Sequence, residues 1–146
     1  MHPFVNVGVS AARKAGNVIL RGAERRDSMV VDVKKANDFV TETDRKAEQV
    51  IIEIIRNSYP AHDILGEESG VILAGDKPAD IEWIIDPLDG TTNFIHGFPH
   101  YCVSIGVREK GRLEHGIIFD PVKNELFTAS RGGGAMLDGK KLRMPR

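Results

Sequence analysis

The chain has 146 residues, the size of one ordinary domain and enough to bury a sizeable hydrophobic core. Its 20 basic and 21 acidic residues nearly cancel, so charge indicates no general attraction to nucleic acid or to an anionic membrane. No apolar run approaches the roughly 18 residues that cross a bilayer, and Met1-His2-Pro3-Phe4 does not open a signal peptide. A soluble, cytoplasmic protein is therefore expected.

The first expected element is an amphipathic helix from Phe4 to about Ala23. Apolar residues recur there at helical spacing, with charged residues mostly on the opposite face. Gly8 and Gly16 lower the helix propensity locally. The mixed segment that follows, residues 25–35, contains a short apolar run at 29–31 that predicts an edge strand leading into a loop.

A second helix is expected to begin near Thr43 and to end before Pro60. Thr41 or Thr43 would be its N-cap, and Asp44 would lie in its first turn. Apolar residues at three- and four-residue steps make this the most regular helical pattern in the chain.

After the second helix, the apolar pattern becomes strand-like. Short strands are expected at Ile64-Leu65 and Trp83-Ile84-Ile85, and a short helix from Thr91 to about His96. Turn signals separate four further strands, at 101–108, 114–119, 125–130 and 135–137. This order predicts an α+β fold, with two N-terminal helices packed on a mainly antiparallel sheet. The sequence does not obviously supply a cover for the second face of this sheet, which predicts self-association.

Carboxylates follow two of the expected strands. Glu67 and Glu68 come directly after the first, and Asp86 and Asp89 directly after the buried one. Side chains at the ends of neighbouring strands converge, so Glu67, Asp86 and Asp89 are expected to share one cation. Mg²⁺ suits such all-oxygen ligands. Taken singly, each acidic pair is typical of a turn or a solvated loop, and the case depends on their combination.

Two features of the segment Asp86 to Thr92 extend this site. Pro87 fixes the backbone between the two carboxylates, which leaves the Leu88 carbonyl as a further ligand. Gly90-Thr91-Thr92 offers N–H groups and hydroxyls to a phosphate, or alternatively only caps the short helix. In a catalytic site, the Thr91 hydroxyl would orient a metal-bound water, and Asp44 would accept its proton or hold Thr91 in place.

Other reactive residues favour ordinary structural roles. His96, His100 and His115 lack the spacing of a metal site, and the glycines at 132–134 are typical of a hairpin turn. Cys102 is the single cysteine of the sequence, so an intrachain disulfide is excluded. Its position in an apolar run is typical of a buried structural thiol. Lys34 and Lys35 are more often solvated than functional, although either is placed to screen phosphate charge near Asp44.

Three segments together resemble a known family, the inositol monophosphatases of the magnesium-dependent, lithium-sensitive phosphatase superfamily. They are Asn37 to Asp44, Gly66-Glu67-Glu68-Ser69, and Trp83 to His96. The third is similar to the first signature of the family and is highly specific. The N-terminal sequence is most similar to that of the bacterial SuhB-type branch. It begins Met-His-Pro and has Ala-Ala-Arg-Lys-Ala-Gly at 11–16. The resemblance covers essentially the whole chain.

The resemblance implies a role for each matching residue. Glu67, Asp86, the Leu88 carbonyl and Asp89 would bind Mg²⁺. Gly90 and Thr91, with Thr92, would contact phosphate, Asp44 and Thr91 would activate water together with Glu67, and Lys34 would lie near the metal cluster. The substrate would be an inositol-1-phosphate-type monoester, attacked in line by water.

Length is the main departure from the family. Members are about twice as long, and nothing after Ser130 resembles their second signature, whose Asp completes a second metal site. The chain is therefore expected to be the first half of an α/β/α/β/α layered fold, weakly active or inactive alone. The resemblance further implies a homodimer in the full-length form.

Two alternative functions stay open. The Asp86 to Asn93 signature also fits phosphatases of nucleotide 3′-phosphates or sugar bisphosphates. From another class, SuhB-type proteins are associated with transcription and ribosome assembly, which implies RNA polymerase or antitermination factors as partners. A substrate panel on the full-length protein distinguishes these phosphatase activities from one another. A pull-down that is insensitive to Asp89→Ala favours the binding role.

Overall fold

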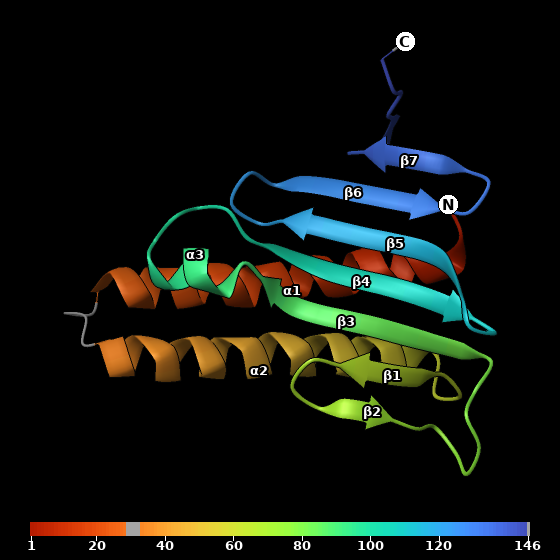
Figure 1. Ribbon diagram of the computed structural model, residues 1–146, viewed down its shortest axis with the longest axis horizontal. Coiled ribbons are helices and arrows are strands. Elements are labelled where there is room, and N and C mark those ends of the chain that lie inside the picture. Colours follow the sequence, from red (N-terminus) through yellow and green to blue (C-terminus); the bar gives the residue numbers. More distant parts are fainter. Residues whose placement is uncertain (29–32, 146) are drawn as a thin grey trace.

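The computed structural model describes residues 1–28 and 33–145, with side chains for 1–25 and 42–145. Two long helices lie on one face of a sheet that has eight strands in this part of the chain (Figure 1). The α+β fold expected from the sequence is confirmed. In chain order the elements are α1 (Pro3–Ser28), α2 (Val33–Ser58), β1 (Asp63–Gly66), β2 (Gly70–Ile72), β3 (Ile81–Asp89), α3 (Thr91–Ile95), β4 (Cys102–Glu109), β5 (Arg112–Asp120), β6 (Glu125–Ser130), β7 (Gly134–Leu137) and β8 (Lys140–Lys141).

The strand order is β2-β1-β3-β4-β5-β6-β7-β8, and every neighbouring pair but one is antiparallel. The exception is β1 with β3, which run parallel with Gly66 opposite Ile85. Because parallel strands end at the same edge of a sheet, the residue after Gly66 lies beside Asp86. The topology therefore brings the two acidic segments of the sequence together.

Helix α1 packs closely on the sheet at two glycines. A Cβ on Gly8 would lie 2.6 Å from Ile117 Cδ1, and one on Gly16 would lie 2.6 Å from a ring carbon of Phe119. The sequence suggested only that these glycines weaken the helix. Their role in the fold is to let the helix backbone approach β5, while buried residues such as Ile19 fill the core beside them.

The expected bounds of the helices were wrong in two places. Helix α1 continues to Ser28, and α2 begins at Val33 rather than near Thr43, since no proline or glycine interrupts Val33–Ser58. Asp44 is therefore an interior residue of α2, and the N-cap role expected of Thr41 or Thr43 is wrong. The strand expected at 29–31 lies outside the described residues. Strand β2 was not among the expected strands.

The other face of the sheet carries no helix among the described residues. Alternate residues of β4 are buried under the helices, whereas Leu113 and Ile118 of β5 are exposed on 55% and 45% of their surface. Strands β4 and β5 pass in front of α1 in Figure 1, which views this open face. Self-association through it stays a prediction. None of the described helices has an apolar stretch long enough to cross a membrane.

Candidate metal and phosphate site

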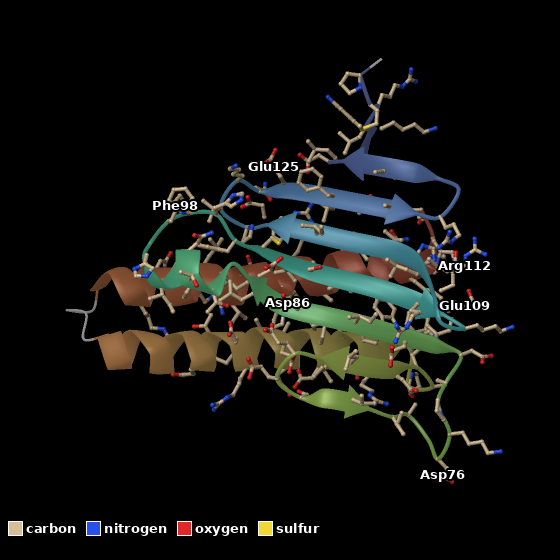
Figure 2. All side chains as sticks on the ribbon, viewed as in Figure 1. Asp76, Asp86, Phe98, Glu109, Arg112 and Glu125 are labelled. Atoms are coloured by element: carbon tan, nitrogen blue, oxygen red, sulfur yellow. The ribbon has the colours of Figure 1, made fainter. Side chains whose placement is uncertain are left out.

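The predicted site residues gather at one end of the sheet, where β1 and β3 end and α2 and α3 lie close by. Asp86 lies at this end of β3 in Figure 2, next to α3, whereas Glu109 and Arg112 lie at the opposite end. Parallel pairing places Glu67 next to Asp86, as the sequence predicted for neighbouring strand ends. Asp44 contributes from the interior of α2.

A β-bulge shapes the end of β3. Asp86 pairs with Ser104 and Asp89 with Cys102, so three steps along β3 match two steps along β4. Pro87 and Leu88 occupy the bulge, where the missing N–H of a proline costs no regular ladder hydrogen bond. The bulge re-aims the chain so that both aspartates belong to the same strand end, with Leu88 buried between them.

Asp44 is a buried carboxylate without enough hydrogen-bond donors. Its side chain is 9% exposed, and Oδ1 has no hydrogen-bond partner among the side chains that the structure describes. Burial, followed by the negative charges of Glu68, Asp86 and Glu48, raises the pKa of Asp44 to about 7. Asp86 Oδ1 is likewise buried, and nothing in the described part of the chain forms a hydrogen bond with it. Buried carboxylate oxygens are costly unless a donor or a cation meets them.

Glu67 is joined to the same cluster. A hydrogen bond with the Asp86 side chain, then burial, then the charges of Asp86, Asp44 and Glu68 raise the pKa of Glu67 to about 7. The carboxyl of Glu67 therefore keeps its proton in a range in which isolated carboxyls are ionised. A divalent cation stabilises such a pair in the same way, through positive charge between the oxygens.

These residues fit a hard divalent cation. Two buried oxygens need a partner, and all the donors are oxygens, the ligands that Mg²⁺ prefers. Within the described residues, no group of three or more His, Cys, Asp and Glu side chains is arranged so that it could hold a metal ion. Mg²⁺ does not require one, because it is usually held by one or two carboxylates and keeps several waters.

The Gly90-Thr91 turn lies directly beyond the carboxylates. Gly90 has φ 101°, and a Cβ there would lie 2.9 Å from the His100 carbonyl oxygen, so this position requires glycine. The Thr91 hydroxyl donates a hydrogen bond to the Leu88 carbonyl at 3.2 Å. That carbonyl keeps a second lone pair. Asn93 Nδ2 donates to the His100 carbonyl at 2.8 Å, which braces the loop after α3.

The remaining expected residues are less central to the cluster. Asp89 and Thr92 are exposed. Cys102 is a half-buried free thiol, and burial, followed by the negative charge of Asp89, raises the pKa of this thiol to about 11. Lys34 belongs to α2, but its side chain lies outside those that the structure describes. The roles of these and the other predicted site residues stay predictions.

Sequence reasoning missed Glu48. This side chain is 2% exposed and faces the Glu67 segment from α2, four residues after Asp44. The signal was present, because a glutamate follows Ala47 on the apolar face of an amphipathic helix. A charged residue at such a position is rarely buried without a specific partner.

A model of the inositol monophosphatase family matches residues 1–146. The chain belongs to this family. A curated relative, Nus factor SuhB from Pasteurella multocida, is 54% identical over 144 residues, which is 99% of this chain and 53% of that protein. The family resemblance seen in the sequence is therefore confirmed.

Solved structures of inositol monophosphatase relatives share the same fold. The extragenic suppressor protein suhB from Bartonella henselae is 38% identical with a TM-score of 0.85, covering 98% of this chain and 54% of that one. Inositol monophosphatase from Anabaena (Nostoc) sp. PCC 7120 is 37% identical with a TM-score of 0.81, covering 97% and 49%. The chain spans about half the length of the curated relatives it matches.

Proposed function

We propose that this chain carries the cation- and phosphate-binding part of a magnesium-dependent phosphate monoester hydrolase for inositol-1-phosphate-type substrates. The observation that carries the proposal is a pair of buried oxygens, on Asp44 and Asp86, that have no hydrogen-bond partner within residues 1–25 and 42–145. They lie with Glu67 in one acidic cluster, and the Gly90-Thr91 turn follows Asp86 in the chain. Membership of the inositol monophosphatase family supports the reaction class and the substrate.

Four residues would hold Mg²⁺: Glu67, Asp86 and Asp89 through their carboxylates, and Leu88 through its carbonyl. A bound cation lowers the pKa of water and neutralises charge on a phosphate oxygen. The raised pKa of Asp44 suits it to accept a proton from the attacking water near neutral pH. The Thr91 hydroxyl, now donating to Leu88, is the group that would orient that water.

Phosphate would lie against the N–H groups of the turn that opens α3. The first N–H groups of any helix lack intrahelical partners, and Gly90 lets an anion approach the backbone closely. Thr91 and Thr92 would add hydroxyls, and Lys34 would balance charge. A pocket of about 330 Å³ beside this turn, lined partly by Asp89, Asn93 and Tyr101, offers room for the alcohol portion of the ester.

Phosphate release from inositol 1-phosphate tests this proposal. The assay compares the 146-residue chain with a full-length version, each with and without Mg²⁺, and with Asp89→Ala. We expect Mg²⁺-dependent release that Asp89→Ala abolishes in the full-length protein, and weak or no release from the shorter chain. Asp76→Asn, on the loop at the far end of the sheet (Figure 2), is the matched control. No Mg²⁺ binding and no release from either length would overturn the enzyme proposal.

Family membership does not specify which phosphate ester is the substrate. Nucleotide 3′-phosphates and sugar bisphosphates carry the same phosphate group and differ only in the part that would enter the pocket beside Asp89. A panel of these esters with inositol 1-phosphate, run on the full-length protein, ranks them by kcat/KM. A larger value for a nucleotide or a bisphosphate would replace the proposed substrate and keep the reaction class.

A second candidate function follows from the name Nus factor on a relative that is 54% identical. We propose that the chain also binds part of a transcription complex, with RNA polymerase or an antitermination factor as the partner. A pull-down with RNA polymerase tests this, using wild type and Asp89→Ala. Equal retention of both would show that binding is independent of the cation site. No retention of either would remove this candidate.

A further inference from the structure

Glu48 is a buried acidic side chain whose role the proposed reaction does not use. It is 2% exposed on the inner side of α2, one helical turn after Asp44. Burying an ionised carboxylate costs several kcal/mol unless hydrogen bonds compensate it, so its partners indicate its purpose.

Those partners all belong to the segment that follows β1. Glu48 Oε1 accepts a hydrogen bond from the Glu68 N–H at 3.1 Å, and Oε2 accepts from the Ser69 N–H at 3.0 Å. Oε2 also accepts from the Ser69 hydroxyl at 2.6 Å. Three donors on two consecutive residues thus meet one carboxylate. Charge-assisted bonds of this kind are roughly twice as strong as neutral ones.

Gly66 makes this contact possible. A Cβ at that position would lie 2.7 Å from Glu48 Oε1 and 2.9 Å from Cδ, so only glycine leaves room for the carboxylate. Gly66 also ends β1, where it pairs with Ile85 directly before Asp86. The carboxylate of Glu48 therefore holds the backbone on both sides of Glu67, with Gly66 packed against it before and Glu68 bonded after.

We propose that Glu48 is a positioning residue that fixes Glu67 against Asp86 for binding a divalent cation. The inference rests on the proposed function, since it concerns how that cation site is held. Glu48 acts only through the backbone of residues 66–69 and does not itself contact the cation. Helix α2 thereby serves the site twice, presenting Asp44 directly and orienting Glu67 through Glu48.

The two oxygens of Glu48 predict which substitution is informative. In Glu48→Gln an amide nitrogen replaces one oxygen and cannot accept from the Glu68 or Ser69 donors. The volume is unchanged, so the packing of α2 is preserved. Gly66→Ala leaves the carboxylate intact but fills the space that it occupies. Both variants attack the same contact from opposite sides. Glu53→Gln, on the exposed face of the same helix, is the matched control.

Binding of Mn²⁺ alone to the 146-residue chain, measured by calorimetry, tests the proposal without requiring activity. Loss of a partner that orients a metal ligand typically weakens metal affinity about 10–100-fold, and we expect that range for Glu48→Gln and for Gly66→Ala. The double variant should bind no more weakly than the weaker single variant, because both remove one contact. Amide hydrogen exchange at Glu68 and Ser69 should accelerate in all three and stay unchanged in Glu53→Gln.

The outcomes separate the two proposals. If wild type binds Mn²⁺ and Glu48→Gln binds it equally well, the positioning role is wrong and the proposed function stands. If the wild-type 146-residue chain binds no Mn²⁺, the inference fails, and the phosphate-release assay on the full-length protein decides the proposed function separately. Should Glu48→Gln not fold, Ser69→Ala removes only the 2.6 Å bond, and an affinity equal to wild type with unchanged exchange at Glu68 would refute the role.

Discussion

Asp44 offers a test of whether the acidic cluster is built for a cation at the expense of stability. Its pKa is raised from an ordinary value of 3.8 to about 7, chiefly by burial. In an unfolded chain the carboxyl ionises near its ordinary pKa, whereas the folded protein keeps the proton up to about pH 7. Rising pH therefore removes stability between these two values, and the loss is complete above pH 7.

The magnitude follows from the size of the pKa difference. Each unit corresponds to about 1.4 kcal/mol, so between pH 5 and pH 8 the folded chain without a cation loses about 2–3 kcal/mol on account of Asp44. This is a large part of the roughly 5–15 kcal/mol that stabilises a typical domain. Asp44→Asn keeps the shape and removes the charge, so this part of the pH dependence should disappear.

Urea denaturation at pH 5 and pH 8, in buffer with EDTA, measures the effect. We expect Asp44→Asn to be more stable than wild type at pH 8 by about 2–3 kcal/mol more than at pH 5, whereas Asp76→Asn shows no such difference. Adding Mg²⁺ at pH 8 should stabilise wild type and affect Asp44→Asn less. A wild-type stability that does not fall between pH 5 and pH 8, or one equally pH-dependent in Asp44→Asn, would refute the reasoning.

Three further substitutions probe how the fold holds the site. Gly16→Ala places a methyl 2.6 Å from the ring of Phe119 and should lower the free energy of unfolding by about 1–3 kcal/mol, whereas Gly116→Ala adds its methyl to open space and serves as the control in the same urea experiment. Asp63→Ala leaves two backbone N–H groups of the following loop without their 2.8 Å acceptor and should cost about 1–3 kcal/mol, detectable as a lower thermal midpoint. Gly90→Ala imposes a side chain at φ 101° and should cost about 1–3 kcal/mol while weakening Mn²⁺ binding, and unchanged values for both would contradict the requirement for glycine.

The sequence predicted the sheet well because its signals are local. Alternating apolar residues and turn residues separate β4, β5, β6 and β7, and each of these strands lies within a few residues of its expected place. The parallel pairing of β1 with β3 is different. Residues 67–80 separate the two strands, and no local sequence pattern specifies that β1 pairs with β3 or in which direction. The bounds of α2 failed for a related reason. Threonine and aspartate near residue 43 are typical of a helix start, but they also occur inside a helix that tertiary packing supports.

The candidate site likewise contains residues that local sequence signals predict and one that only long-range contacts explain. Glu67, Asp86 and Asp89 could be proposed from the sequence because each carboxylate follows an apolar run, although β3 itself continues through Asp86 to Asp89. Glu48 is not predictable in this way, since its partners are backbone N–H groups about 20 residues ahead, and backbone donors leave no trace in residue identity. The sequence does show two unusual residues: a glutamate on the buried face of a helix, and a glycine at residue 66 where no turn requires one. Two local anomalies that are unexplained separately become one contact in the fold, which is why residues that break a local rule are the ones to examine first in a site of this kind.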